Sequence, residues 1–239
     1  MAEPVPGPLA LVGSGEYLPQ MAGVEAALLA GRPPRYVQLA TAAVPDGPEV
    51  VGYWHRLGEE QARRLGAQPV IVPVADRADA DDPAMAALVE GAGLVYLSGG
   101  HPGYLASTLR GTAVWAAVVA AWRHGSALAG CSAGAMAFAS WVPSLRRPGA
   151  PSGPGLGLLP RLRVVPHFDR FSARAAGRSW LGPEDSGVTV LGIDEDTALV
   201  GGPATWVVHG RGQVHDLSTG QGPYPAGSTL TLPEGQGDR

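Results

Sequence analysis

The chain has 239 residues, a formal net charge of −4 and one cysteine, Cys131, so no internal disulfide can form. Its 17 basic residues are all arginine and are spread along the chain against 21 acids, which argues against nucleic acid as a partner. The N-terminus lacks the pattern of a signal peptide, and the longest apolar run, residues 113–122, is too short to span a bilayer. We therefore expect a cytoplasmic protein with no membrane partner.

The first half of the chain alternates between predicted strands and predicted helices. Short continuous apolar runs predict buried strands at residues 9–12, 36–39, 70–74, 94–97 and 127–129. Helical patterns fall between them, at residues 21–30, 52–65, 83–90 and 103–123. This alternation predicts an α/β fold, a three-layer sandwich whose central sheet is mostly parallel and covered on both faces.

The second half is richer in predicted strands. Residues 145–160 contain too much proline and glycine for regular structure and predict a loop within one domain. Strands follow at 162–165 and 188–193, and shorter β-like runs at 198–200, 205–209 and 228–232 form a β-rich C-terminal segment. We expect a single domain over residues 1–239, with a frayed tail from about residue 233.

One motif points to chemistry. The apolar run 127–129 leads into Gly130-Cys131-Ser132-Ala133-Gly134 and then into a helix-forming stretch. Gly-x-Ser-x-Gly between a strand and a helix is typical of a nucleophile elbow, a strained turn in which glycine leaves room on either side of the serine. The Ser132 hydroxyl would then project from the carboxyl edge of the sheet, where it can attack a carbonyl.

The motif by itself is a weak signal. About 0.3 matches are expected by chance in a chain of this composition. Its place at a strand-to-helix transition favours the elbow over a plain turn of small residues. Cys131 occupies the neighbouring slot, and we interpret it as a small buried hydrophobic residue that points away from the site.

A serine nucleophile needs a base. The candidates are the six histidines His55, His101, His124, His167, His209 and His215. His167 follows the predicted strand 162–165, so it should emerge at the same sheet edge as Ser132, although a structural histidine is the alternative. His101 follows another strand end and is expected to line the pocket.

Two further parts of a hydrolytic site can be assigned to strand ends. Asp194 and Glu195 follow the strand 188–193, and either carboxylate could orient the imidazole. Gly99 and Gly100 follow the strand 94–97 and could supply one oxyanion-hole amide, with Ala133 supplying the other. Glycine pairs also end strands simply because the chain turns there.

These residues resemble the cyanophycinase and aspartyl-dipeptidase (dipeptidase E) family of serine peptidases. The motifs that carry the resemblance are Leu-Ser-Gly-Gly at 97–100, Leu-Arg-Gly-Thr at 109–112, Ala-Gly-Cys-Ser-Ala-Gly-Ala at 129–135, Gly-Leu-Gly-Leu-Leu-Pro at 155–160, Pro-His-Phe at 166–168 and Gly-Ile-Asp-Glu-Asp-Thr-Ala at 192–198. The resemblance implies a class I glutamine amidotransferase-like fold. It also implies Ser132 as nucleophile, His167 as base and Glu195 as orienting acid, with Asp194 as the fallback.

The chain departs from that family at residues expected to hold substrate. His101 and Pro102 stand where cyanophycinases have Asp or Asn followed by Gln, and Pro166 stands where they have Gln. Three arginines after the histidine, Arg170, Arg174 and Arg178, are spaced as one stripe of a solvated helix, or could bind a carboxylate. We therefore expect cleavage of a small, aspartyl-containing peptide or isopeptide more than of the polymer, with Arg170, Arg174 and His101 as substrate contacts.

Other patterns suggest no further chemistry. Gly13-Ser14-Gly15-Glu16 lacks the last glycine of a dinucleotide-binding motif, so we interpret it as a loop at the active-site edge. No close His/Cys spacing predicts a metal, and no cofactor is expected. Two alternatives stay open: an esterase of the α/β-hydrolase type that uses Ser132, Asp194 and His209, and a non-catalytic binding protein. A homodimer is possible, but no interface can be identified.

Overall fold

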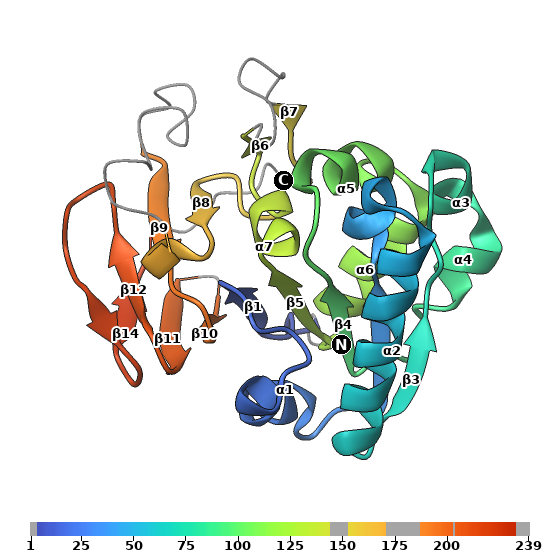
Figure 1. Ribbon diagram of the computed structural model, residues 1–239, viewed down its shortest axis with the longest axis horizontal. Helices are drawn as coiled ribbons and strands as arrows, with labels where there is room; N and C mark the ends of the chain where they lie inside the picture. Colours follow the sequence, from blue (N-terminus) through green and yellow to red (C-terminus); the bar gives the residue numbers. More distant parts are fainter. Residues whose placement is uncertain (1–3, 144–152, 171–186, 203, 233–239) are drawn as a thin grey trace.

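A large mixed sheet forms the centre of the protein. The computed structural model describes residues 4–143, 153–170, 187–202 and 204–232 (Figure 1). Within these residues the sheet consists of β1 (Leu9–Val12), β2 (Arg35–Leu39), β3 (Gln68–Ile71), β4 (Leu94–Leu97), β5 (Ala127–Cys131), β10 (Thr197–Gly201), β11 (Thr205–Gly210) and β14 (Thr229–Thr231), in the order β14-β11-β10-β1-β5-β4-β2-β3. The first five strands pair in parallel, whereas β10, β11 and β14 pair antiparallel. The predicted α/β class with a mostly parallel sheet is confirmed.

Helices cover both faces of the sheet. They are α1 (Ala22–Leu29), α2 (Pro48–Arg64), α3 (Arg77–Asp81), α4 (Pro83–Ala87), α5 (Pro102–Leu109), α6 (Ala113–Arg123) and α7 (Ala133–Ala137). Side chains of β1 alternate between two buried clusters, because successive residues of a strand point to opposite faces. Leu9 and Leu11 join a cluster formed with α5, α6 and α7, and Ala10 and Val12 join one formed with α1 and α2. These two clusters define the three layers.

The single helix predicted over residues 103–123 is wrong, since two helices occupy that stretch. Gly111 adopts φ 72° between them, and the Thr112 side chain accepts a hydrogen bond from the Trp115 amide at 3.4 Å, which caps α6. Among the described residues no single helix is long and apolar enough to cross a membrane. The α5–α6 pair meets that test by length and composition, with a 93° bend at its break.

A second sheet lies beside the antiparallel end of the first, at the opposite end of the molecule from α3 and α4 (Figure 1). Its described strands are β8 (Leu162–Val165), β9 (Thr189–Ile193), β12 (Gln213–Asp216) and β13 (Tyr224–Pro225), in the order β13-β12-β9-β8. β8 and β9 pair in parallel. The two predicted strands 162–165 and 188–193 therefore exist, but in a sheet of their own and not in the central one.

Shorter elements complete the described chain. They are the 3-10 helices η1 (Pro19–Met21), η2 (Thr41–Asp46) and η3 (Phe168–Arg170) and the paired short strands β6 (Trp141–Val142) and β7 (Gly153–Pro154). β7 shows that the predicted loop 145–160 is not wholly irregular. Residues 144–152 of that loop and the predicted tail 233–239 lie outside the described residues. The single domain stays a prediction.

Candidate active site

Ser132 stands at a sharp turn between β5 and α7. Its backbone has φ 48° and ψ −105°, a conformation that non-glycine residues rarely adopt. The Ser132 amide donates to the carbonyl oxygen of Val12 at 2.9 Å, which ties the turn to the end of β1. The strand, strained serine and helix follow one another as a nucleophile elbow requires.

The two glycines of the motif stand where the backbone is most crowded. A Cβ built on Gly130 would lie 2.5 Å from the carbonyl carbon of Gly134, and a Cβ on Gly134 would lie 2.4 Å from the carbonyl oxygen of Leu97. Real side chains do not approach backbone atoms this closely. The close approach of α7 to β4 and β5 therefore demands glycine at both positions.

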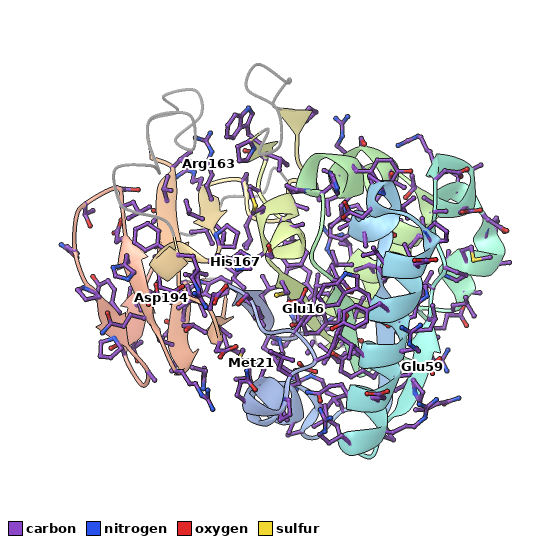
Figure 2. The ribbon with its side chains drawn as sticks, in the orientation of Figure 1. Glu16, Met21, Glu59, Arg163, His167 and Asp194 are labelled. Atoms are coloured by element: carbon purple, nitrogen blue, oxygen red, sulfur yellow. The ribbon has the colours of Figure 1, made fainter. Side chains whose placement is uncertain are left out.

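Ser132, His167 and Glu195 form a continuous hydrogen-bonded line. The distance from Ser132 Oγ to His167 Nε2 is 3.1 Å, and that from His167 Nδ1 to Glu195 Oε1 is 3.0 Å. His167 follows β8 with φ 51°, and Glu195 lies in the turn between β9 and β10. Figure 2 places His167 between the second sheet and α7. His167 and its partner Glu195 thus both come from the border of the second sheet.

Two more hydrogen bonds hold Glu195, one on its carboxylate and one on its backbone amide. Arg170 Nε donates to Glu195 Oε2 at 2.8 Å, and the Glu195 amide donates to Asp169 Oδ1 at 2.8 Å. The hydrogen bond from His167, followed by that from Arg170, lowers the pKa of Glu195 below its usual value. The carboxylate therefore keeps its negative charge beside the imidazole.

Asp194 belongs to a different network. Its Oδ2 accepts a hydrogen bond from the Gln213 amide at 2.9 Å, and its Oδ1 lies 3.4 Å from His215 Nε2. His209 lies within β11, paired with Ala198 of β10. In the described part of the chain no contact joins Asp194 to His167 or to His209. The geometry favours Glu195 over Asp194, and it does not assemble the esterase triad.

Two amides remain candidates for the oxyanion site, because no hydrogen bond among the described residues uses the amide of Ala133 or that of Gly100. Ala133 stands at the first position of α7, where a helix leaves its amide hydrogens without internal acceptors. Gly100 has φ 137°, and a Cβ there would lie 2.3 Å from the carbonyl oxygen of Ala42. Gly99 departs from the expectation, because its amide donates to Glu16 Oε1 at 3.0 Å. Gly100 is therefore the better candidate of the pair for an oxyanion contact.

The expected substrate contacts have mixed outcomes. His101 Nε2 lies 2.9 Å from Asp46 Oδ1, and the His101 amide donates to the Ala42 carbonyl oxygen, so this ring stands next to Gly100 on a fixed backbone. Arg170 is bound to Glu195, although its side chain is still 71% exposed. Arg174, like Arg178, lies outside the described residues.

Cys131 is fully buried and donates its thiol hydrogen to Glu16 Oε2 at 2.8 Å. Burial, with the nearby Glu16 carboxylate as a further cause, raises the pKa of this thiol. The thiol is thus neutral and turned away from the Ser132 hydroxyl, in agreement with our interpretation. It is more than a hydrophobic filler, however, because it has a polar partner.

Sequence reasoning missed the residues that support the site from behind. Three acids could not be found, because each has its partner far away along the chain. Asp46 lies 55 positions from His101, Asp169 lies 26 from Glu195, and Glu16 lies 83 from Gly99 and 115 from Cys131. The one available signal was the acid in the small-residue loop Gly13-Ser14-Gly15-Glu16. No group of three or more potential metal ligands occurs among the residues that the structure describes.

Comparisons with known proteins identify the kind of protein that carries such a site. Residues 41–202 match the model of peptidase family S51. A peptidase from an acI-B1 actinobacterium has 40% sequence identity and a TM-score of 0.86, over 95% of this chain and 97% of that one. The fold is shared with a putative peptidase E protein from Listeria monocytogenes EGD-e. That protein has 14% sequence identity and a TM-score of 0.60, over 87% of this chain and 100% of that one. A comparison with curated proteins finds no match.

Proposed function

The chain belongs to peptidase family S51 and is a serine peptidase, and from that premise we propose that it cleaves small aspartyl-containing peptides or isopeptides with Ser132, His167 and Glu195. The observation that carries the proposal is the unbroken line of two hydrogen bonds from the strained serine through the imidazole to the carboxylate. A nucleophile, a base and an orienting acid within hydrogen-bond reach are what acyl transfer needs.

The reaction would proceed through an acyl-enzyme. As Ser132 Oγ bonds to the carbonyl carbon, its proton moves to His167 Nε2 and the carbonyl electron pair becomes an oxyanion, which the amides of Gly100 and Ala133 stabilise. Glu195 accepts a hydrogen bond from the Nδ1–H group of His167 and stabilises the imidazolium, without taking the proton itself. Collapse breaks the C–N bond, and the amine takes the proton from His167. Water then attacks the acyl ester and gives a proton to His167 Nε2. That proton returns to Ser132 Oγ as the carboxylic acid product leaves.

The preference for an acidic residue is supported by the Arg170 guanidinium beside the line. Arg170 uses its Nε on Glu195, and the described residues offer no acceptor to its terminal nitrogens, which can therefore reach a substrate carboxylate. His101, on the Gly100 side, is the second candidate contact. We propose Arg174 on sequence spacing alone. The cytoplasmic location, the absence of a nucleic-acid partner and the possible homodimer stay predictions.

The proposal is tested by mass-spectrometric hydrolysis of a dipeptide panel with α-aspartyl, β-aspartyl and neutral N-terminal residues. We expect cleavage confined to the aspartyl members, and its loss in Ser132→Ala and His167→Ala proteins that remain folded. Asp194→Asn serves as the matched control for Glu195→Gln, because Glu195 is hydrogen-bonded to His167 whereas the neighbouring Asp194 accepts from the Gln213 amide. Activity retained by purified Ser132→Ala would contradict the proposed nucleophile, and equal cleavage of neutral members would contradict the aspartyl preference.

A further inference from the structure

A buried carboxylate lies directly behind the elbow. Glu16 is 6% exposed and stands in the loop after β1. Its Oε1 accepts the Gly99 amide hydrogen at 3.0 Å, and its Oε2 accepts the Cys131 thiol hydrogen at 2.8 Å. Figure 2 labels it where β1, β4 and β5 lie close together. Each oxygen of one carboxylate therefore holds the end of a different central strand.

The two donors are the chain neighbours of the groups that the proposed reaction uses. Cys131 precedes Ser132, and Gly99 precedes Gly100. A Cβ built on Gly99 would lie 2.7 Å from Glu16 Oε1 and 3.5 Å from Ser132 Cβ, so the carboxylate and the nucleophile are close to the same glycine. A side chain at Gly99 would therefore have to displace the end of the Glu16 side chain. The glycine at this position is needed for the approach of Glu16, and not only because the strand turns.

The contacts restrict the geometry of the oxyanion site. The bond to Glu16 fixes the peptide between Ser98 and Gly99, and the crowding of Gly100 against Ala42 fixes the next turn. Only a few dihedral angles remain between these two anchors, so the direction of the Gly100 amide is determined before substrate arrives. Preorganised donors of this kind contribute to catalysis because they need no rearrangement as charge develops.

We propose that Glu16 is a positioning residue. It holds the Gly99-Gly100 turn and the Cys131-Ser132 elbow in a fixed position relative to each other, so that the oxyanion site is preformed. The inference rests on the proposed function, since it assigns Gly100 and Ser132 to one reaction. Glu16 itself contacts neither substrate nor the reacting atoms. Its loss should therefore lower the rate of the chemical step and leave substrate binding nearly unchanged.

The experiment compares Glu16→Gln with Glu25→Gln in the full chain. A glutamine has only one acceptor oxygen, and its amide nitrogen would face a donor in place of the second. We expect kcat to fall about 10- to 100-fold with KM changed less than about twofold, because a misaligned donor costs less than a deleted one. Glu25 is the control because it is also a buried carboxylate, in helix α1, but does not share the donors of Glu16: the described hydrogen bonds to Glu25 come from the Tyr36 hydroxyl and, at 3.4 Å, from the Tyr17 amide. Its variant should keep the wild-type kcat.

A second measurement does not depend on the identity of the peptide. A fluorophosphonate reacts with an activated serine and develops charge on its phosphoryl oxygen, so its rate of covalent labelling, followed by intact mass, reports the oxyanion site. We expect Glu16→Gln to be labelled about 10- to 100-fold more slowly than the wild type, and Ser132→Ala not at all. If Glu16→Gln does not fold, Cys131→Ala takes its place, because it removes one of the two donors to Glu16 without adding a polar group. We expect Cys131→Ala to be labelled roughly threefold or more slowly than the wild type.

The outcomes separate the two proposals. Labelling of wild type and Glu16→Gln at equal rates, with Ser132→Ala unlabelled, would overturn the role of Glu16 and leave the serine peptidase mechanism in place. If Glu16→Gln does not fold, labelling of Cys131→Ala at the wild-type rate would also overturn the role of Glu16. A rise in KM with unchanged kcat would also overturn it, because Glu16 would then act on binding. A wild-type protein that is not labelled would overturn the proposed nucleophile, and the inference with it.

Discussion

At Ser132 the positive φ angle is a strained conformation that costs on the order of 1 to 3 kcal/mol in a non-glycine residue. The surrounding structure maintains it through the bond from the Ser132 amide to Val12 and the close packing of Gly130 on α7. The strain points the hydroxyl out of the sheet and toward His167. Residue choice at the two glycines is therefore dictated by space, and the serine between them by chemistry.

This view predicts that Gly130→Ala damages both folding and activity. Its Cβ would meet backbone atoms of Gly134 and Ala135 at 2.5 to 2.7 Å, which only movement of α7 can relieve. We expect a loss of about 2 to 3 kcal/mol in the free energy of unfolding, measured in urea, and a fall in hydrolysis or serine labelling. Gly103→Ala is the control, because nothing lies within 4 Å of its Cβ and it stands in α5, where alanine is favoured. Equal stabilities of the two variants would contradict the packing argument.

At the scale of elements, the break between α5 and α6 is the feature that periodicity could not reveal. Leu105, Leu109, Val114 and Val118 recur every four or five residues across it and are all buried in one cluster. Buried apolar side chains continue where the backbone bends, so hydrophobic spacing alone predicted one helix. The bend depends on local groups instead, namely the positive φ of Gly111 and the cap formed by Thr112.

We expect Thr112→Ala to destabilise the protein by about 1 kcal/mol, because it removes the acceptor for the Trp115 amide. The Thr112 hydroxyl also donates to the Leu109 carbonyl oxygen at 2.6 Å, so the substitution loosens both ends of the break. Urea unfolding measures the difference, with Thr229→Ala on the exposed face of β14 as the control. If Thr112→Ala were as stable as the wild type, the cap would contribute nothing to the start of α6.

For the whole molecule, a buried polar network on the α1–α2 face links stability to pH. Glu25 is 2% exposed, and the Tyr36 hydroxyl donates to its Oε2 at 2.7 Å. Burial raises the pKa of Glu25 from 4.5 to about 7. The folded state therefore binds a proton more tightly than the unfolded chain. The resulting stabilisation is complete below about pH 4.5 and is lost as pH rises through about 7.

The comparison of wild type with Glu25→Gln isolates this effect, since glutamine is neutral at every pH. We expect the unfolding free energy of the wild type, relative to the variant, to fall by roughly 2 kcal/mol between pH 5 and pH 8. Urea unfolding at four or five pH values measures it. A difference that does not change with pH would show that Glu25 is ionised to the same extent in both states.

The sequence by itself determined the elements whose cause is local. The apolar runs predicted β1 and β4 to the residue, because a strand buried on both faces needs a continuous apolar stretch. The elbow was predictable for a similar reason, since Gly130, Ser132 and Gly134 report a crowded, strained turn through their residue types alone. Ser132, His167 and Glu195 could be named as candidates because each follows a predicted strand.

Tertiary structure decided what those candidates contact. His167 reaches Ser132, and Glu195 reaches His167, from the border of a second sheet. No strand pattern separates that sheet from the central one, because a buried strand looks the same in either sheet. The choice between Asp194 and Glu195 depended on which way neighbouring side chains turn. Glu16 gained its two partners only because the chain brings the ends of three strands together. Contacts between residues far apart in the sequence follow from the packing of whole layers, and local residue types do not encode them.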